Sequence, residues 1–185
     1  MTSASEVLDF WFAGDPATHR EVWFEKDTAF DTACADLAAA RDSAKSGALD
    51  AWAETPKGGL ALIILLDQLS RNLHRGTAEA FATDAKARAV ARAMLARGFD
   101  QALTPPERMF VYLPFEHSED LADQDLAVRL YAALDAITDE KMLDYAERHR
   151  DVIRRLGRFP HRNAALGRAN TAQEDAYLAD PNAGF

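Results

Sequence analysis

The sequence has only one cysteine, no long apolar run and no basic leader. A single Cys34, at helical spacing from Phe30, excludes an internal disulfide and a cysteine-rich metal site, and we expect it to be a small core residue. The longest apolar run, LALIILL at residues 60–66, is much shorter than the roughly 20 residues of a membrane-spanning helix. Glu6 and Asp9 interrupt the N-terminal apolar stretch, which is therefore no secretory signal. We expect a cytoplasmic protein.

Basic residues are also fewer than acidic residues. The 185 residues contain 21 Lys and Arg against 30 Asp and Glu, which gives a formal net charge of −9. Nucleic-acid binding requires a basic face, and docking on anionic membranes requires basic clusters, so neither partner is expected. The hydrophobic fraction of 48% is ordinary for a globular chain, and the length predicts one domain over residues 1–185.

Strand signals are missing as well. There is no alternating Val/Ile/Thr run and no Asn-Gly hairpin turn. The patterns instead predict an all-α fold of about nine short-to-medium helices, packed antiparallel in pairs, with no sheet. Ser3 with Glu6, and Thr171 with Glu174, have the spacing of helix-capping boxes. The expected core includes four apolar residues, Leu62, Leu65, Leu66 and Phe110.

Three polar stretches stand out on this apolar frame. The first is LLDQLSRNLHRG (65–76), in which Asp67, Arg71 and Arg75 follow one another at intervals of four. On a helix these side chains share one face. They form either an ordinary salt bridge with a charged cap, or the polar end of a helix that emerges into a cleft.

The second stretch is YLPFEHSED (112–120). Pro114 is expected to end one helix and Ser118 to cap the next one. This leaves Glu116 and His117 between the two helices, where an imidazole beside carboxylates can transfer a proton near neutral pH. A plain hydrogen bond that holds the loop is the alternative.

The third stretch, LGRFPHRNAALGR (156–168), lies in the most basic part of the chain. Seven arginines and two histidines occur between Arg148 and Arg168, with Asp151 as the only carboxylate. Such a cluster needs counter-charges, either from acidic residues of the fold or from a bound anion. We expect Arg158 and Arg162 to be the arginines left without an internal partner.

These stretches also carry a resemblance. Together with VLDFWF and WFEKDTAFD, they resemble the bacterial "domain of unknown function 924" family over about residues 5–178. The family pattern D-Q-x-x-R-N-x-x-R-G matches residues 67–76, P-x-E-H-S-E matches 114–119, and G-R-F-P-H-R-N matches 157–163. The resemblance implies an all-helical fold similar to tetratricopeptide-repeat domains, and no established activity.

Three functions remain open at this point. The first is a pocket for an anionic small molecule with a phosphate or carboxylate group, with or without catalysis. The second is a helical-repeat module that binds a peptide or protein, and the third is a structural arginine–carboxylate network without a ligand. The candidates for proton transfer are His117, Glu116 and Glu119. The candidates for ligand binding are Asp67, Arg71, Asn72, Arg75, Gln124, His149, Arg158, His161, Arg162, Asn163 and Arg168.

No cofactor is expected, and the histidine spacing lacks the H-x-x-x-H pattern of a metal-binding helix. A metal held by Glu116, His117, Glu119 and one distant histidine is a minor alternative.

Overall fold

The computed structural model describes residues 2–24, 27–138 and 141–180, and 73% of the chain is helical. No strand occurs in these residues, so the all-α prediction is confirmed. The α-helices are α1 (Ala4–Phe12), α2 (Thr28–Cys34), α3 (Ala38–Ser46), α4 (Pro56–Ile63), α5 (Ser70–Leu73), α6 (Asp84–Ala96), α7 (Pro105–Glu116), α8 (Leu121–Asp135), α9 (Met142–Leu156) and α10 (Ala172–Ala179). The 3₁₀ segments are η1 (Glu21–Trp23), η2 (Ala35–Leu37), η3 (Asp50–Glu54), η5 (Ala78–Phe81), η6 (Phe99–Ala102) and η7 (Pro160–Arg162), and η4 (Ile64–Leu69) is π-helical.

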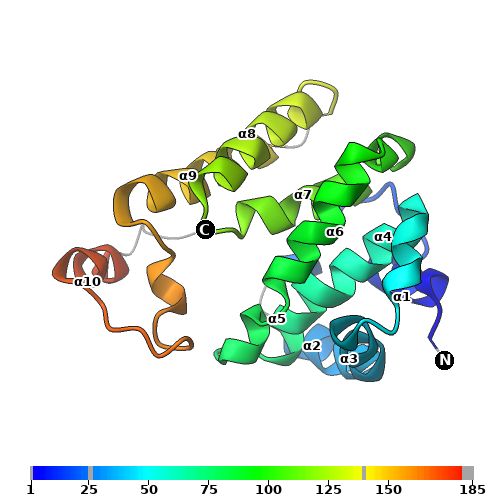
Figure 1. The fold of residues 1–185 in the computed structure, drawn as a ribbon, viewed down its shortest axis with the longest axis horizontal. Coiled ribbons are helices and arrows are strands. Elements are labelled where there is room, and N and C mark those ends of the chain that lie inside the picture. Colours follow the sequence, from blue (N-terminus) through cyan, green and yellow to red (C-terminus); the bar gives the residue numbers. More distant parts are fainter. Residues whose placement is uncertain (1, 25–26, 139–140, 181–185) are drawn as a thin grey trace. The chain divides into compact units, whose positions relative to one another are not determined.

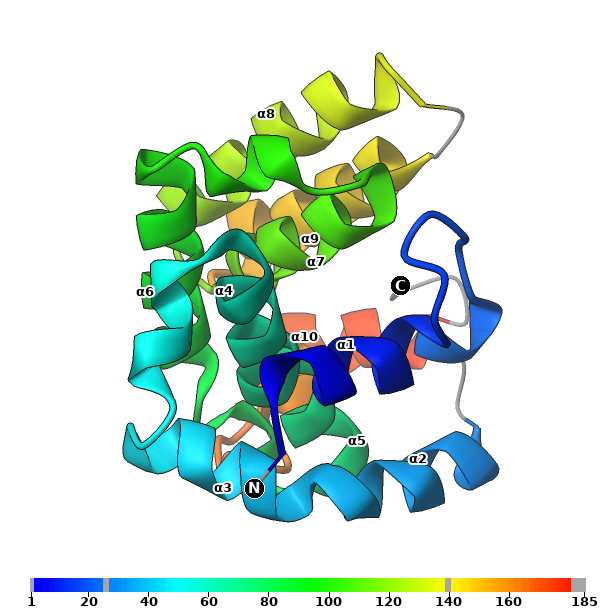
Figure 2. The same cartoon turned by 90° about the vertical axis from the view of Figure 1, so that its right-hand side faces the viewer.

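Several of these helical segments are continuous with one another along the chain. The segment η2 joins α2 to α3, and Figure 2 shows these two helices following one line. In the same way η4 joins α4 to α5. The described chain therefore contains eight continuous helices, close to the nine that were predicted.

Contacts divide the chain into two compact units. The N-terminal unit comprises Met1–Arg75 and Glu79–Pro114, and the C-terminal unit comprises Gly76–Ala78 and Phe115–Phe185. In the N-terminal unit, α4 packs against α1, α6 and η3 (Figure 1). All residues from Leu60 to Leu66 are inaccessible to solvent, which is why this helix is apolar on every side. The predicted core residues Leu62, Leu65, Leu66 and Phe110 are all fully buried.

The C-terminal unit is built on the pair α8 and α9, which lie side by side in Figure 1. Val152 and Ile153 of α9 pack with Phe159 in a small apolar core, against which Leu156 and Tyr177 also pack. Gly157 ends α9 in the left-handed conformation (φ 74°), as its position after the last apolar residue predicts. The turn leads directly into the third polar stretch.

The helix boundaries around residue 116 differ from the prediction. The helix α7 continues through Pro114 to Glu116, because a proline in the last turn removes only one backbone hydrogen bond. Asp120, rather than Ser118, is the N-cap of α8 and accepts a hydrogen bond from the Ala122 N–H at 2.8 Å. Glu119 is thereby left outside the helix. Residues 139–140, at the expected start of the next helix, lie outside the described residues.

Candidate functional site

The second and third polar stretches meet in the C-terminal unit through Glu119. Arg168 donates to both carboxylate oxygens of Glu119, at 2.8 and 2.9 Å, and the backbone N–H of Phe159 donates to one of them at 2.8 Å. Burial raises the pKa of Glu119, but these hydrogen bonds outweigh it and hold the pKa below its usual value. Glu119 therefore orders the loop as a carboxylate, which leaves little scope for the proton-transfer role predicted for it.

Arg168 extends this network to Asn163. The Nε of Arg168 donates to Oδ1 of Asn163 at 2.8 Å, and Nδ2 of Asn163 donates to Asn170 at the same distance. Arg168 also donates to the carbonyl of Phe159 at 3.1 Å. Asn163 is almost fully buried. Both residues thus hold the irregular backbone after Gly157 in place.

Arg158 and Arg162 both have partners within the chain, so the expectation that they lack one is wrong. The partner of Arg158 is a carboxylate. Arg158 donates to the two oxygens of Glu174 at 2.5 and 2.8 Å, and to the carbonyl of Ala169 at 2.8 Å. Glu174 also closes the capping box of α10 with Thr171, as predicted. The hydrogen bonds from Arg158 and from the backbone of Thr171 lower the pKa of Glu174 to about 2.

Three of the remaining candidates gather around the ring of Phe159, and a fourth, His117, lies beside one of them. The Arg162 guanidinium lies over this ring, 4.6 Å from its centroid. The rings of His149 and His161 lie 5.7 and 5.5 Å from it, and His117 lies 6.3 Å from His149. We call His117, His149, Phe159, His161 and Arg162 the histidine–arginine cluster. His161 is exposed, His117 is half-buried, and the other three are buried.

His149 is held from two sides within this cluster. Its Nδ1 lies 2.8 Å from the carbonyl oxygen of Tyr145, one turn earlier in α9, and 3.1 Å from Oε1 of Glu116. Burial, with smaller contributions from His117, His161 and Arg162, lowers the pKa of His149 to about 3, although the contact with the Tyr145 carbonyl raises it. The ring is therefore neutral at pH 7.

Gln124 supports the loop that carries Glu116. From α8, its Nε2 donates to the carbonyl oxygens of Glu116 and Ser118, both at 2.6 Å. Gln124 is fully buried, and its Oε1 accepts no hydrogen bond from the described residues.

The first polar stretch lies in the N-terminal unit and pairs with acids of that unit. Arg71 contacts Asp67 at 3.0 Å and donates to both oxygens of Asp84, at 3.0 and 3.1 Å. Asn72 donates to Asp31 at 2.7 Å. Arg75 donates to both oxygens of the same Asp31, at 2.7 and 2.9 Å. These contacts match the salt-bridge alternative given for this stretch.

The family model for "Bacterial protein of unknown function (DUF924)" matches residues 7–182 of this chain. The chain belongs to this family. A solved structure described as a protein of unknown function, ATU0120, from Agrobacterium tumefaciens, is 43% identical and covers 95% of this chain and 96% of its own, with a TM-score of 0.86. No curated protein matches the chain. The three polar stretches are thus set in a fold that this chain shares with the Agrobacterium protein.

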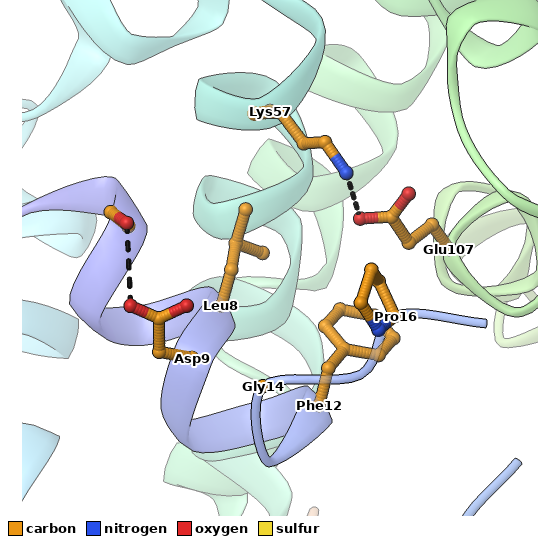
Figure 3. Close-up of a pocket in the computed structure, with 8 residues that line it drawn as sticks. Leu8, Asp9, Phe12, Gly14, Pro16, Lys57 and Glu107 are labelled. Atoms are coloured by element: carbon orange, nitrogen blue, oxygen red, sulfur yellow. Dashed lines mark hydrogen bonds and ion pairs between the residues drawn. The ribbon is translucent and has the colours of Figure 1, made fainter. Parts of the chain in front are cut away.

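The structure also contains a cavity that no sequence motif predicts. A cavity of about 260 Å³ in the N-terminal unit lies beside an ion pair between Lys57 and the buried Glu107 (Figure 3). Its lining residues are Ser5, Leu8, Asp9, Phe12, Gly14, Pro16, Lys57 and Glu107. They come from three distant segments, so no local motif marks them, and none is a predicted site residue.

Neither a metal-binding cluster nor a membrane-spanning helix is found among the described residues. Among the described residues, no three His, Cys, Asp or Glu side chains are placed to hold a metal ion. Within the same residues, the helices are all too short or too polar to cross a bilayer.

Proposed function

We propose that this DUF924 protein binds a small molecule with a phosphate or carboxylate group at the histidine–arginine cluster. The observation that supports this proposal is the placement of the Arg162 guanidinium over the ring of Phe159, with the rings of His149 and His161 beside the same ring. Arg162 supplies a permanent positive charge to this cluster, and His161 is exposed to solvent. Guanidinium and imidazole N–H groups donate hydrogen bonds to phosphate and carboxylate oxygens.

Preorganisation supports the same function. The guanidinium of Arg162 lies over the ring of Phe159, and the backbone N–H of Phe159 donates to Glu119. A planar guanidinium that is already oriented loses little side-chain entropy when it binds a carboxylate or phosphate. Arg158 and Arg168 are assigned a different role, because they hold the loop through Glu174 and Glu119.

Titration calorimetry with inorganic phosphate and with citrate, at low salt, tests this proposal. We expect both anions to bind the wild type and Arg162→Met to weaken binding at least about tenfold, equivalent to about 1.4 kcal/mol. Arg154→Met is the matched control, since Arg154 is a half-exposed arginine of the same unit that contacts Asp125 at 3.4 Å. Absence of binding to the wild type, or equal weakening by both variants, would show that the proposal is wrong.

A structural role is favoured for the first stretch alone. Arg71 and Arg75 each reach a carboxylate through two hydrogen bonds, with Asp84 and Asp31 respectively. Candidate ligand contacts by Asp67, Arg71, Asn72 and Arg75 therefore compete with these internal bonds. The tetratricopeptide-like arrangement and the cytoplasmic location stay predictions.

A further inference from the structure

The cavity of the N-terminal unit has both charged and apolar side chains on its wall (Figure 3). One side of the wall is a single face of α1, on which Ser5, Leu8, Asp9 and Phe12 recur at intervals of three and four residues. The other side comes from the loop after α1 and from the first turns of α4 and α7. All of these segments belong to the N-terminal unit, so the cavity is formed within that unit alone.

Thr104, the residue before α7, holds two parts of the wall together. Its hydroxyl donates to the carbonyl oxygen of Pro16 at 2.5 Å, although 88 positions separate the two residues. Its backbone N–H donates to Oε2 of Glu107 at 3.0 Å. These bonds link the loop after α1 to the start of α7, so the cavity is already formed before any ligand binds.

The charges on the wall do not balance. Glu107 is almost fully buried, and Lys57 neutralises it in an ion pair. Asp9 is exposed, and the hydrogen bond that it accepts within the described chain is a long one, from the Ser5 hydroxyl at 3.4 Å. Figure 3 shows the Asp9 carboxylate apart from the Lys57–Glu107 pair. The lining therefore keeps one net negative charge, which a ligand with one positive charge would balance.

The apolar part of the wall limits the kind of cation that fits. Leu8, Phe12 and Pro16 offer hydrocarbon surface in the same cavity as the carboxylate. The volume of about 260 Å³ lies just below the roughly 300–1,000 Å³ of ordinary ligand pockets. These properties favour a molecule of few atoms with a short hydrocarbon chain, rather than a nucleotide or a peptide.

We infer that this cavity binds a small primary amine, whose ammonium group pairs with Asp9 and whose hydrocarbon chain packs against Leu8, Phe12 and Pro16. The cavity shares no residue with the histidine–arginine cluster, and it takes a cation where that cluster takes an anion. Failure of the anion site would leave this inference unaffected, and the reverse also holds.

Chemical-shift titrations of ¹⁵N-labelled protein at pH 7 and low salt test the inference with three probes. Pentylamine, 1-pentanol and hexanoate carry a positive, a neutral and a negative head group on hydrocarbon chains of similar length. We expect pentylamine to shift the amide signals of residues 5–16 and to bind about three- to fivefold more tightly than 1-pentanol, as for an exposed ion pair. Hexanoate should bind more weakly than 1-pentanol, because Asp9 repels its carboxylate.

Three variants assign the effect to particular side chains. Asp9→Asn keeps the shape of the side chain and removes its charge, so it should bind pentylamine and 1-pentanol equally. Asp36→Asn, at an exposed carboxylate of the same unit outside the cavity wall, is the matched control and should keep the wild-type preference. Leu8→Phe adds bulk to the wall and should weaken the binding of both probes. If Leu8→Phe does not fold, Asp9→Asn decides by itself, since Asp9 is exposed.

Three results would overturn the inference. Equal binding of the three probes would show that the cavity does not select by charge, and tighter binding of hexanoate would show that Lys57 selects an anion instead. Absence of shifts at residues 5–16, with or without shifts at other exposed carboxylates, would show that the amine only follows the net negative charge of the protein or does not bind.

Discussion

Arg158 donates two hydrogen bonds to Glu174, at 2.5 and 2.8 Å, across sixteen residues of sequence. Glu174 at the same time accepts the backbone N–H of Thr171 at 2.7 Å and so caps α10. One carboxylate thus fixes both the loop after α9 and the start of the last helix. The most basic part of this acidic chain is ordered largely by acids that lie outside it.

This pair predicts a specific sensitivity to acid. The pKa of Glu174 is about 2 in the fold, below its value of about 4.3 in an unfolded chain. Its contribution to stability is therefore complete above pH 4.3 and is lost as the pH falls towards 2. Glu174→Gln can still cap α10 and should lower Tm at pH 7. Between about pH 4.3 and pH 2, the Tm of this variant should depend less on pH than the Tm of the wild type. Asp175→Asn, at an exposed neighbouring carboxylate, is the control, and an unchanged Tm for Glu174→Gln at pH 7 would contradict the prediction.

The two arginines of the first stretch should differ strongly in their effect on stability. Arg71 is 19% exposed and neutralises Asp67, which is fully buried, and Asp84. Arg71→Met should cost about 3–5 kcal/mol, because it leaves buried carboxylates without their cation. Arg75 is 41% exposed, and Arg75→Met should cost less than about 1 kcal/mol. Urea unfolding of both variants measures the difference, and similar losses would refute this account of the network.

Two adjacent glycines of α4 provide a packing test. A Cβ at Gly58 would lie 2.2 Å from the backbone oxygen of Trp52, whereas a Cβ at Gly59 would meet Sδ of Met94 at 2.7 Å. Helix propensity alone predicts that alanine stabilises either position by about 1 kcal/mol. We expect Gly58→Ala to destabilise the protein by about 1–3 kcal/mol, since a backbone carbonyl cannot move aside. Gly59→Ala should be milder, because the end of a methionine side chain can move. The denaturant midpoints of both variants, compared with that of the wild type, test this prediction. A Gly58→Ala variant more stable than the wild type would contradict the close contact.

His149 should make the fold less stable as the pH falls below neutral. Its pKa is about 3 in the fold and about 6.5 in an unfolded chain, so the unfolded state takes up the proton first. Stability is then fully present above pH 6.5 and declines below it, by up to about 1.4 kcal/mol per pH unit from this group. His149→Gln should show a shallower decline between pH 6.5 and 4.5 than the wild type in urea titrations. His19→Gln, at an exposed histidine, should decline like the wild type, and a parallel decline of His149→Gln would argue against a buried neutral ring.

The sequence by itself determined the features that depend on near neighbours along the chain. Ser3 with Glu6 and Thr171 with Glu174 form their capping boxes as predicted, because each box joins residues only three apart. The all-apolar run from Leu60 is buried for an equally local reason, since a helix without a polar face must lie inside the core.

Only the tertiary structure decided which charges pair. Glu119 and Arg168 are separated by 49 residues, and no periodic pattern links them. The prediction that Arg158 lacks an internal partner failed because Glu174 was assigned only to its helix cap, although a carboxylate has lone pairs for both the cap and a guanidinium. The contact between His149 and Glu116 likewise joins residues that are 33 positions apart. Pairings of this kind are decided by which helix ends meet in the folded chain, and that is a property of packing rather than of local sequence.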